Sequence, residues 1–334
     1  MAQGEGTKPT TVSIVTTVYN CEKYIEECLK SILAQGYPHI EHIVQDAAST
    51  DDTLKILQKY TDKIKLKSEP DRGQSDGLNR ALQRSTGDII LVLNADDILL
   101  PGACSWAVEN MKKYPDAAVI YGDVYIINEK GETLRLYKAP ADYSFDKLLC
   151  VELVPPAQAA FIRRSHFEEV GFYADATLDT CPDYEMWVRI GAQFQMQYVP
   201  GIVAKYRVFA TERMESKQKK SVKRFFRAKK LVMDKILHDP DSKESIKTLK
   251  TRAYVGLNIW ACTVSYGEEK RIEDALRYGF MALQLAPLRK KLIVLSKIIL
   301  MYYWNFLWLQ KIVTTLNIRK IFGKYLRKIY ETKW

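Results

Sequence analysis

Three apolar or β-rich runs in the first hundred residues lead directly into aspartates. The run 40–45 ends at Asp46, the run 64–70 at Asp71, and the run 89–95 at Asp96 and Asp97. Ligands of an open α/β sheet bind beyond the carboxyl ends of its strands, so we expect these carboxylates to share one crevice. Such carboxylates repel one another and need a cation, and oxygen ligands with substrate phosphates suit Mg²⁺ or Mn²⁺. The sequence therefore predicts a site for a metal ion and a nucleotide.

Strand-like and helix-like patterns alternate through the first half of the chain. Strands are expected at 11–18, 40–45, 64–68 and 88–94, and helices at 22–35, from 49–52 to about 60, at 75–84 and from Pro101 onward. Residues 117–128 and 133–137 read as a hairpin. Four successive βα units predict an α/β fold with a mostly parallel sheet and helices on both faces. After about Phe209 the patterns are helical and basic.

The turn after the first strand excludes one common class of nucleotide-binding fold. A dinucleotide-binding fold needs Gly-x-Gly-x-x-Gly at this place, and the chain has Thr-Thr-Val-Tyr-Asn at residues 16–20. A glycine-rich stretch at residues 4–8 precedes the strand instead of following it. Neither a dinucleotide-binding domain nor a sugar nucleotidyltransferase is therefore expected.

Composition is that of a folded protein of about two domains. The 334 residues are 47% hydrophobic and 27% charged. Residues 288–334 carry eleven Lys/Arg and one acid, so they account for the whole net charge of +10. Six scattered cysteines have no zinc spacing, and the first residues form no apolar signal region, which favours a reducing cytoplasm.

Six segments, taken together and in order, resemble the family 2 glycosyltransferases of the non-processive bacterial type, which have the GT-A fold. The segments are VSIVTTVYN at 12–20, DAASTD at 46–51, DRGQSDGLN at 71–79, NADD at 94–97, QAAFIRR at 158–164 and DYEMWVR at 183–189. The resemblance spans roughly residues 10–207. It implies a Rossmann-like mixed sheet, mostly parallel, followed by an all-helical basic C-terminal region.

The resemblance also implies roles for individual residues. It places Thr17 and Tyr19 beside the nucleobase, with Asp46 and Asp71 accepting hydrogen bonds from a uracil-type N–H. Two further residues belong to the family's metal motif: Asp96 on the ribose or phosphate side, which also counts among the metal-binding residues, and Asp97 as the direct ligand of Mn²⁺ or Mg²⁺.

Asp183 matches the catalytic base, which takes the proton of the acceptor hydroxyl. The residue before it is Pro182, where the family usually has Glu. The His that often follows the Tyr-Arg pair is also missing after Arg207. No catalytic histidine is therefore assigned.

Other polar residues have two readings. Asp51 suits a helix start better than a ligand. The pair Asp76 and Asn79 faces either the sugar or solvent, and Arg189 and Arg207 reach either a phosphate or an internal acid. Trp187 suits packing better than chemistry.

The expected domain limits follow these patterns. Residues 1–10 form a disordered N-terminus, 11–210 the glycosyltransferase domain, 211–286 a helical extension, and 287–334 basic aromatic helices. Within the domain, residues 11–100 form the nucleotide-sugar half and 101–210 the acceptor half.

The last segment predicts a membrane surface as partner. Residues 288–309 are apolar and aromatic with basic flanks, but Lys297 and Asn305 interrupt them. A helix lying on anionic lipid fits this pattern better than a spanning one. A helical bundle or a homo-oligomer contact is the alternative, and nucleic acid is not expected because the apolar run favours lipid.

These features lead to one expected function: metal-dependent transfer of a single sugar, with inversion, from a nucleotide-diphosphate sugar, a UDP-sugar, to a glycan or lipid-linked acceptor. The pathway expected is cell-surface polysaccharide or glycolipid synthesis at the inner face of the cell membrane. A catalytically silent nucleotide-sugar-binding or scaffold subunit is the alternative.

Overall fold

The computed structural model describes residues 9–175, 177–178, 180–209, 222–267, 272–288 and 290–296. The chain forms two compact units, one of residues 1–149 and 153–236 and the other of residues 150–152 and 237–334. The predicted disordered residues 1–8, the predicted boundary near 210 and most of the basic aromatic tail lie outside the described residues. The domain limits expected from the sequence remain predictions.

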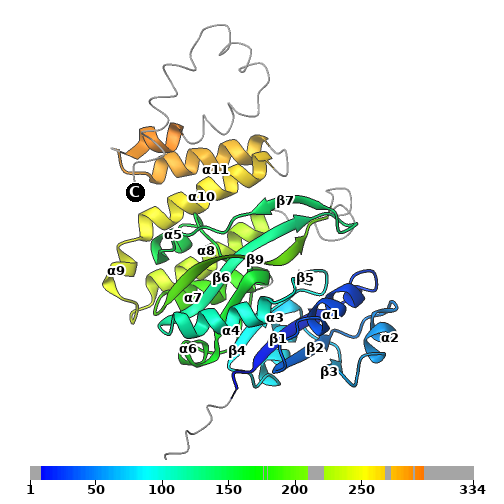
Figure 1. The fold of residues 1–334 in the computed structure, drawn as a ribbon. Helices are drawn as coiled ribbons and strands as arrows, with labels where there is room; N and C mark the ends of the chain where they lie inside the picture. Colours follow the sequence, from blue (N-terminus) through cyan, green and yellow to red (C-terminus); the bar gives the residue numbers. More distant parts are fainter. Residues whose placement is uncertain are drawn as a thin grey trace, which may run out of the picture. The chain divides into compact units, whose positions relative to one another are not determined.

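The first unit is built on one mixed sheet (Figure 1). Its strands are β1 (Val12–Val18), β2 (Ile40–Asp46), β3 (Lys65–Ser68), β4 (Ile89–Val92), β5 (Ile98–Leu99), β6 (Ala117–Ile127), β7 (Thr133–Tyr137), β8 (Ala160–Arg163) and β9 (Gln195–Arg207). The order is β3-β2-β1-β4-β8-β6-β9-β5, and β7 pairs with β6. Strands β1 to β4 are parallel to one another, and β8 joins them antiparallel.

Helices cover the sheet of this unit. They are α1 (Ile25–Leu33), α2 (Thr53–Gln58), α3 (Gln74–Gln83), α4 (Ala103–Lys113), α5 (Phe145–Leu149), the 3₁₀ turn η1 (Ala157–Ala159), α6 (Arg164–Glu169), α7 (Pro182–Gly191) and α8 (Val222–His238). Helix α3 packs on β1 and β2, and α4 packs on β6 and β9. Since helices bury the strands, β1 is an almost unbroken run of buried residues.

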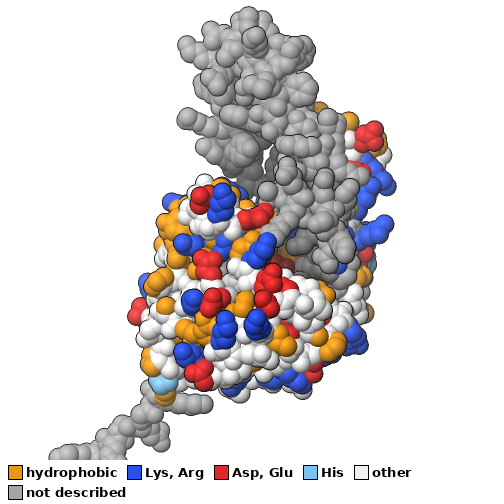
Figure 2. All heavy atoms as spheres, turned by 90° about the vertical axis from the view of Figure 1, so that its right-hand side faces the viewer, with side chains coloured by type: hydrophobic (Ala, Val, Ile, Leu, Met, Phe, Trp, Pro, Cys, Tyr) orange, Lys and Arg blue, Asp and Glu red, His pale blue; other side chains and the backbone are white. Residues whose placement is uncertain are grey.

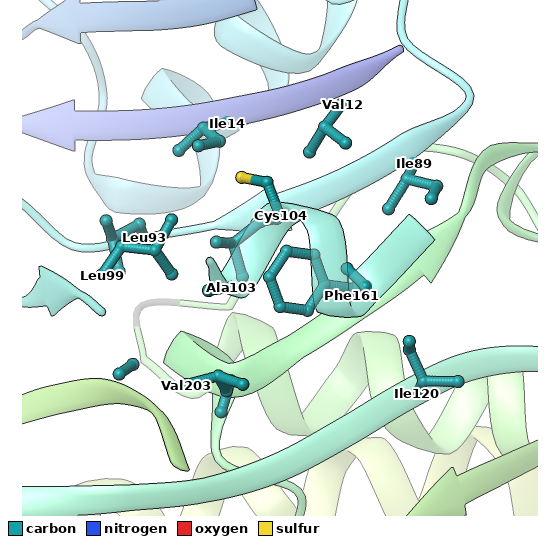
Figure 3. Close-up of a cluster of buried hydrophobic side chains, with 14 of the residues drawn as sticks. Val12, Ile14, Ile89, Leu93, Leu99, Ala103, Cys104, Ile120, Phe161 and Val203 are labelled. Carbon is teal, nitrogen blue, oxygen red and sulfur yellow. The ribbon is translucent and has the colours of Figure 1, made fainter. Parts of the chain in front are cut away.

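The main core lies between β1, β4 and the second half of the sheet. Figure 3 shows side chains of this cluster, which come from β1, β4, β5, α4, β6, β8 and β9. The fold is the mixed α/β architecture that the sequence predicted, with the four βα units and the hairpin in place. Strands β5, β8 and β9 arise from segments to which the sequence patterns assign no strand.

Charges of both signs lie on the described part of one face of the molecule. Figure 2 shows Lys/Arg and Asp/Glu side chains interspersed on the described part of the face that it draws. This agrees with the balance of charge in residues 1–287.

The second unit is helical. Its helices are α9 (Glu244–Lys247), α10 (Lys250–Gly267) and α11 (Ile272–Leu285), and residues 290–296 are also helical. Val255, Ala282, Ala286 and Val294 form its small buried cluster. Among the described residues, none of the helices combines the length and apolarity that crossing a membrane requires.

Candidate functional site

The parallel strands end side by side at one edge of the sheet. Val18, Asp46 and Ser68 are register partners at the ends of β1, β2 and β3. Tyr19 follows β1 directly and is 62% exposed, which is unusual for a tyrosine next to a buried strand. An exposed aromatic face at this edge suits stacking with a planar ligand.

Asp46 is fully buried at this edge. One carboxylate oxygen accepts from Ser49 Oγ at 2.5 Å and the other from Ser68 Oγ at 2.5 Å, and the Ser49 amide also donates to it. The carboxylate therefore ties the ends of β2 and β3 to the following loop. In this structure it positions two hydroxyls, and it presents no surface to solvent.

Asp71 lies in the loop before α3 and is partly exposed. Its Oδ1 accepts from the Gly73 amide at 2.9 Å, and among the described residues Oδ2 has no hydrogen-bond donor. A Cβ built on Gly77 would lie 2.6 Å from Asp71 Oδ2 and 3.7 Å from Thr17 Cγ2. The structure therefore brings Thr17 and Asp71 together over one glycine of α3.

Asp96 and Asp97 occupy different environments. Asp97 is fully buried, and it accepts from the Arg207 amide at 2.9 Å and from Asn94 Nδ2 at 3.0 Å. Burial, reinforced by the charge of Asp96, raises the pKa of Asp97 well above its usual range, while a bond from Gln158 opposes this. Asp96 is partly exposed. Of the two carboxylates, Asp96 is the more exposed. The sequence led us to expect Asp97 as the direct metal ligand, and that assignment stays a prediction.

Arg207 fixes the backbone beneath this pair. Its buried guanidinium donates to the Asp96 carbonyl at 2.9 Å, to the Asn128 and Glu129 carbonyls, and to Glu27 Oε2 at 2.6 Å. These contacts engage every nitrogen of the group. The sequence allowed Arg207 to contact either a phosphate or an internal acid, and the structure shows it paired with the acid Glu27.

Arg189 is also internal. It pairs with Glu185 one helical turn away and donates to the carbonyls of Val170 and Tyr173. It therefore braces α7 against the loop that follows α6.

Asp183 is the second residue of α7 and is partly exposed. The helix begins after Cys181, whose φ of 59° is left-handed, and the Tyr184 amide donates to Asp183 Oδ1 at 2.8 Å. Behind it, the buried Lys229 of α8 lies 3.9 Å from the centre of the Tyr184 ring. Burial lowers the pKa of Lys229, while the charges of Cys181 and Asp183 raise it. Asp183 thus lies in the first turn of α7, close enough to Lys229 for its charge to act on that lysine.

Helix α3 connects the two groups of carboxylates. Asn79 makes two hydrogen bonds with the Ala174 backbone, and Ser75 Oγ donates to the Leu178 carbonyl at 3.4 Å. The same helix carries Gly77 against Asp71. The loop before Asp183 and the loop of Asp71 are therefore both held by α3. Asp76 instead pairs with Arg72 and Arg80.

Sequence reasoning assigned no role to several residues that shape the site. Gln158 of η1 forms a hydrogen bond with Asp97, and the charges of Lys229 and Asp183 interact. The Asp71 carboxylate lies where a side chain on Gly77 would be. Gln158 and Gly77 lie within segments that resemble the family, which was the only available signal. Lys229 lies in a basic helix whose pattern indicates no burial of a lysine.

The residues present fit a hard divalent cation that arrives with its substrate. Among the described residues, no group of three or more His, Cys, Asp or Glu side chains could hold a metal by itself. Mg²⁺ and Mn²⁺ commonly bind through one or two carboxylates together with substrate phosphates. Asp96, at the strand edge and partly exposed, offers such a carboxylate.

Comparison with known proteins identifies the family to which this part of the chain belongs. Residues 13–171 match the model of glycosyl transferase family 2. The chain carries a family 2 glycosyltransferase domain. This domain contains β1 to β4, Asp46, Asp71, Asp96 and Asp97, and its match ends before α7.

Among curated relatives, a glycosyltransferase of Rickettsia conorii is 31% identical over 207 residues, which are 59% of this chain and 34% of that protein. The chain spans about a third of the length of this relative.

Solved structures show the same fold around the family 2 domain. S. aureus TarS 1-349 in complex with UDP-GlcNAc has a TM-score of 0.63 at 18% identity, covering 87% of this chain and 89% of that one. The mannosyltransferase PcManGT from Pyrobaculum calidifontis, in complex with GDP-Man and Mn²⁺, has a TM-score of 0.59 at 18% identity, covering 95% and 89%.

Proposed function

We propose that the chain transfers one sugar from a UDP-sugar to a hydroxyl of a glycan or lipid-linked acceptor, with a divalent cation and with inversion. The observation that carries this proposal is that α3 holds both the loop of Asp71 and the loop that leads to Asp183, two partly exposed carboxylates. Asp71 and Asp96 lie at the strand edge, and Asp183 begins the helix that follows the loop held by Asn79 and Ser75. The family match of residues 13–171 supports the same chemistry.

Each side chain has a defined task in this proposal. Tyr19 stacks on the base, and Asp71 Oδ2 accepts its imide N–H, since no described donor engages that oxygen. Asp96 holds the cation, and Asp97, buried and bonded to Arg207 and Asn94, holds the Asp96 backbone in place. A cation bound there neutralises the diphosphate leaving group.

Asp183 acts on the acceptor side. It takes the hydroxyl proton while the hydroxyl oxygen forms a bond to the anomeric carbon and the bond to the diphosphate breaks. One such displacement inverts the configuration of the sugar. Since Glu185 is paired with Arg189, Asp183 is the carboxylate of this turn that remains available as a base.

A turnover assay tests the proposal. Purified protein is incubated with UDP-sugars and GDP-sugars, and sugar release or transfer is measured with Mn²⁺, with Mg²⁺ and with EDTA. TarS binds UDP-GlcNAc and PcManGT binds GDP-Man, so both nucleotides belong in the screen. Metal-dependent release from a UDP-sugar supports the proposal. Binding without any release by the intact protein would favour a silent subunit instead.

We further propose that the second unit binds an anionic membrane surface, where the acceptor is assembled into cell-surface polysaccharide or glycolipid at the cytoplasmic face. Leu288, Leu292 and Leu295, spaced along one helix face, are 84%, 78% and 39% exposed. On α11, Leu276 and Phe280 are also exposed. From residue 275 to 330 the sequence has no Asp or Glu. Apolar faces among basic residues suit the interface of anionic lipid.

Vesicle sedimentation tests this partner. The full chain should sediment with phosphatidylserine-containing vesicles and much less with neutral ones. The double variant Leu288→Glu, Leu292→Glu should bind at least about tenfold more weakly. The matched control is Leu134→Glu, Leu136→Glu, which alters two exposed leucines of β7 in the first unit. Equal losses in both double variants would contradict a lipid face on the second unit.

A further inference from the structure

We infer that Gly77 is a positioning residue of the nucleotide site, and that its missing side chain is what places Asp71 Oδ2 where a base can reach it. The identity of the ligand rests on the proposed function, but the placement of the carboxylate does not. Gly77 lies in the first half of α3 and is buried. A Cβ at this position would lie 2.6 Å from Asp71 Oδ2, closer than real Cβ contacts allow.

The backbone conformation at residue 77 does not require a glycine. Gly77 lies within a regular helix, its amide bonds the Gly73 carbonyl at 3.1 Å, and it has no positive φ. Glycine within a helix is less stable than alanine, so the helix alone gives no reason for it. The close approach of the Asp71 carboxylate gives one.

The loop that carries Asp71 cannot easily retreat. Arg80 donates to the Pro70 carbonyl at 2.9 Å, and the Arg72 amide donates to Asp76 Oδ2 at 3.1 Å. Both anchors come from α3, and they flank Asp71 on either side. A Cβ on Gly77 would therefore displace the carboxylate by side-chain rotation, with the loop backbone in place.

Such a rotation changes what the carboxylate can bind. At present Oδ1 is engaged by the Gly73 amide and Oδ2 points at α3 near the Thr17 methyl group. Thr17 lies in β1, two residues before the exposed Tyr19, so we infer that this is the position from which Oδ2 meets a base stacked on that ring. Moving Oδ2 removes a charge-assisted hydrogen bond to the base while Tyr19 remains available for stacking.

The test is a double-mutant cycle of Gly77→Ala and Asp71→Ala in the full chain, with UDP as probe in calorimetry. Gly77→Ala should weaken UDP binding by about 10–100-fold, the usual effect of losing a hydrogen bond to a charged group. In the Asp71→Ala background the same change should have little effect. The thermal midpoint of Gly77→Ala should be equal to or above that of the parent, because alanine favours the helix. Gln83→Ala, at the exposed last residue of α3, is the matched control and should bind UDP like the parent.

Two results would overturn the inference: unchanged UDP affinity in Gly77→Ala, or an equal loss in both backgrounds. A crystal structure of Gly77→Ala without ligand gives a readout that does not depend on the donor. It should show the Asp71 carboxylate rotated and the loop backbone in place, and an unmoved carboxylate would refute the placement. If the parent does not bind UDP, the proposed donor is contradicted. If the crystal of Gly77→Ala still shows the Asp71 carboxylate displaced, the role of Gly77 remains supported.

Discussion

Asn79 of α3 pairs its side-chain amide with the backbone of Ala174, 95 residues later. Its Nδ2 donates to the Ala174 carbonyl at 2.9 Å, and its Oδ1 accepts from the Ala174 amide at 2.8 Å. A helix of the nucleotide half therefore holds the loop that leads to Asp183. Asn79 had two readings in the sequence, a sugar contact or a solvent-facing residue, and the structure shows that it is a structural clamp.

Replacing Asn79 with Ala should separate donor binding from transfer. Two hydrogen bonds are lost and two backbone groups lose their partner, so the free energy of unfolding should fall by about 1–3 kcal/mol. Nucleotide affinity should change little, while kcat falls because the loop before Asp183 loses its anchor. Urea unfolding and steady-state kinetics measure both effects. A kcat equal to that of the parent would show that the loop keeps its position without the clamp.

Asp96 and Asp97 should give different phenotypes. Asp96→Asn should raise the Mn²⁺ concentration needed for half-maximal activity by tenfold or more, because the partly exposed carboxylate holds the ion. Asp97→Asn places an amide where Arg207 and Asn94 donate, so it should lower stability by about 1–3 kcal/mol. Metal titration and thermal unfolding of both variants distinguish the roles. The reverse pattern would identify Asp97 as the direct ligand, as the family resemblance implies.

Asp183→Asn should reduce transfer by about 10²–10⁴-fold, the usual contribution of a general base, with donor binding close to that of the parent. Asn keeps the shape of the side chain and its place at the helix start, so folding should be preserved. Glu185→Gln is the control: it breaks the pair with Arg189 and should retain transfer within a few fold. Near-parental turnover of Asp183→Asn would exclude it as the base.

His42 should make stability depend on pH. It is buried in β2, its Nε2 lies 3.0 Å from Thr16 Oγ1, and burial lowers its pKa to about 3. The unfolded chain takes up a proton near pH 6.5 and the folded chain does not. Stability is therefore full above about pH 6.5 and is lost as the pH falls towards 3, by at most about 1.4 kcal/mol per pH unit.

Urea unfolding of the parent and of His42→Gln between pH 7 and 4 isolates this contribution, since other groups titrate in both proteins. The difference in unfolding free energy between them should shrink as the pH falls, because the parent alone loses the stability that comes from a neutral buried imidazole. A constant difference across this range would mean that His42 takes up its proton at the same pH in the folded and the unfolded chain, so that its pKa is not lowered by folding.

Local patterns in the sequence were enough to predict the strands and helices of the first half of the sheet. Alternating apolar runs and helical periodicity predicted β1 to β4, α1 to α4 and the β6–β7 hairpin, because each of these elements has its period within its own segment. The same reasoning placed the candidate carboxylates at the strand ends and Asp183 at a helix start. The family resemblance that led to the GT-A fold lay in those same segments.

Only the tertiary structure decided which polar groups are buried and which are partly exposed. Asp46 and Asp97 look like Asp71 and Asp96 in the sequence, yet the first two are buried by Ser49, Ser68 and Arg207. Strand β9 exists because it pairs with β6, about eighty residues earlier in the chain. The closeness of Gly77 to Asp71 depends on how α3 packs on its own preceding loop. Burial and pairing depend on partners distant in the chain, and a local pattern carries no information about them.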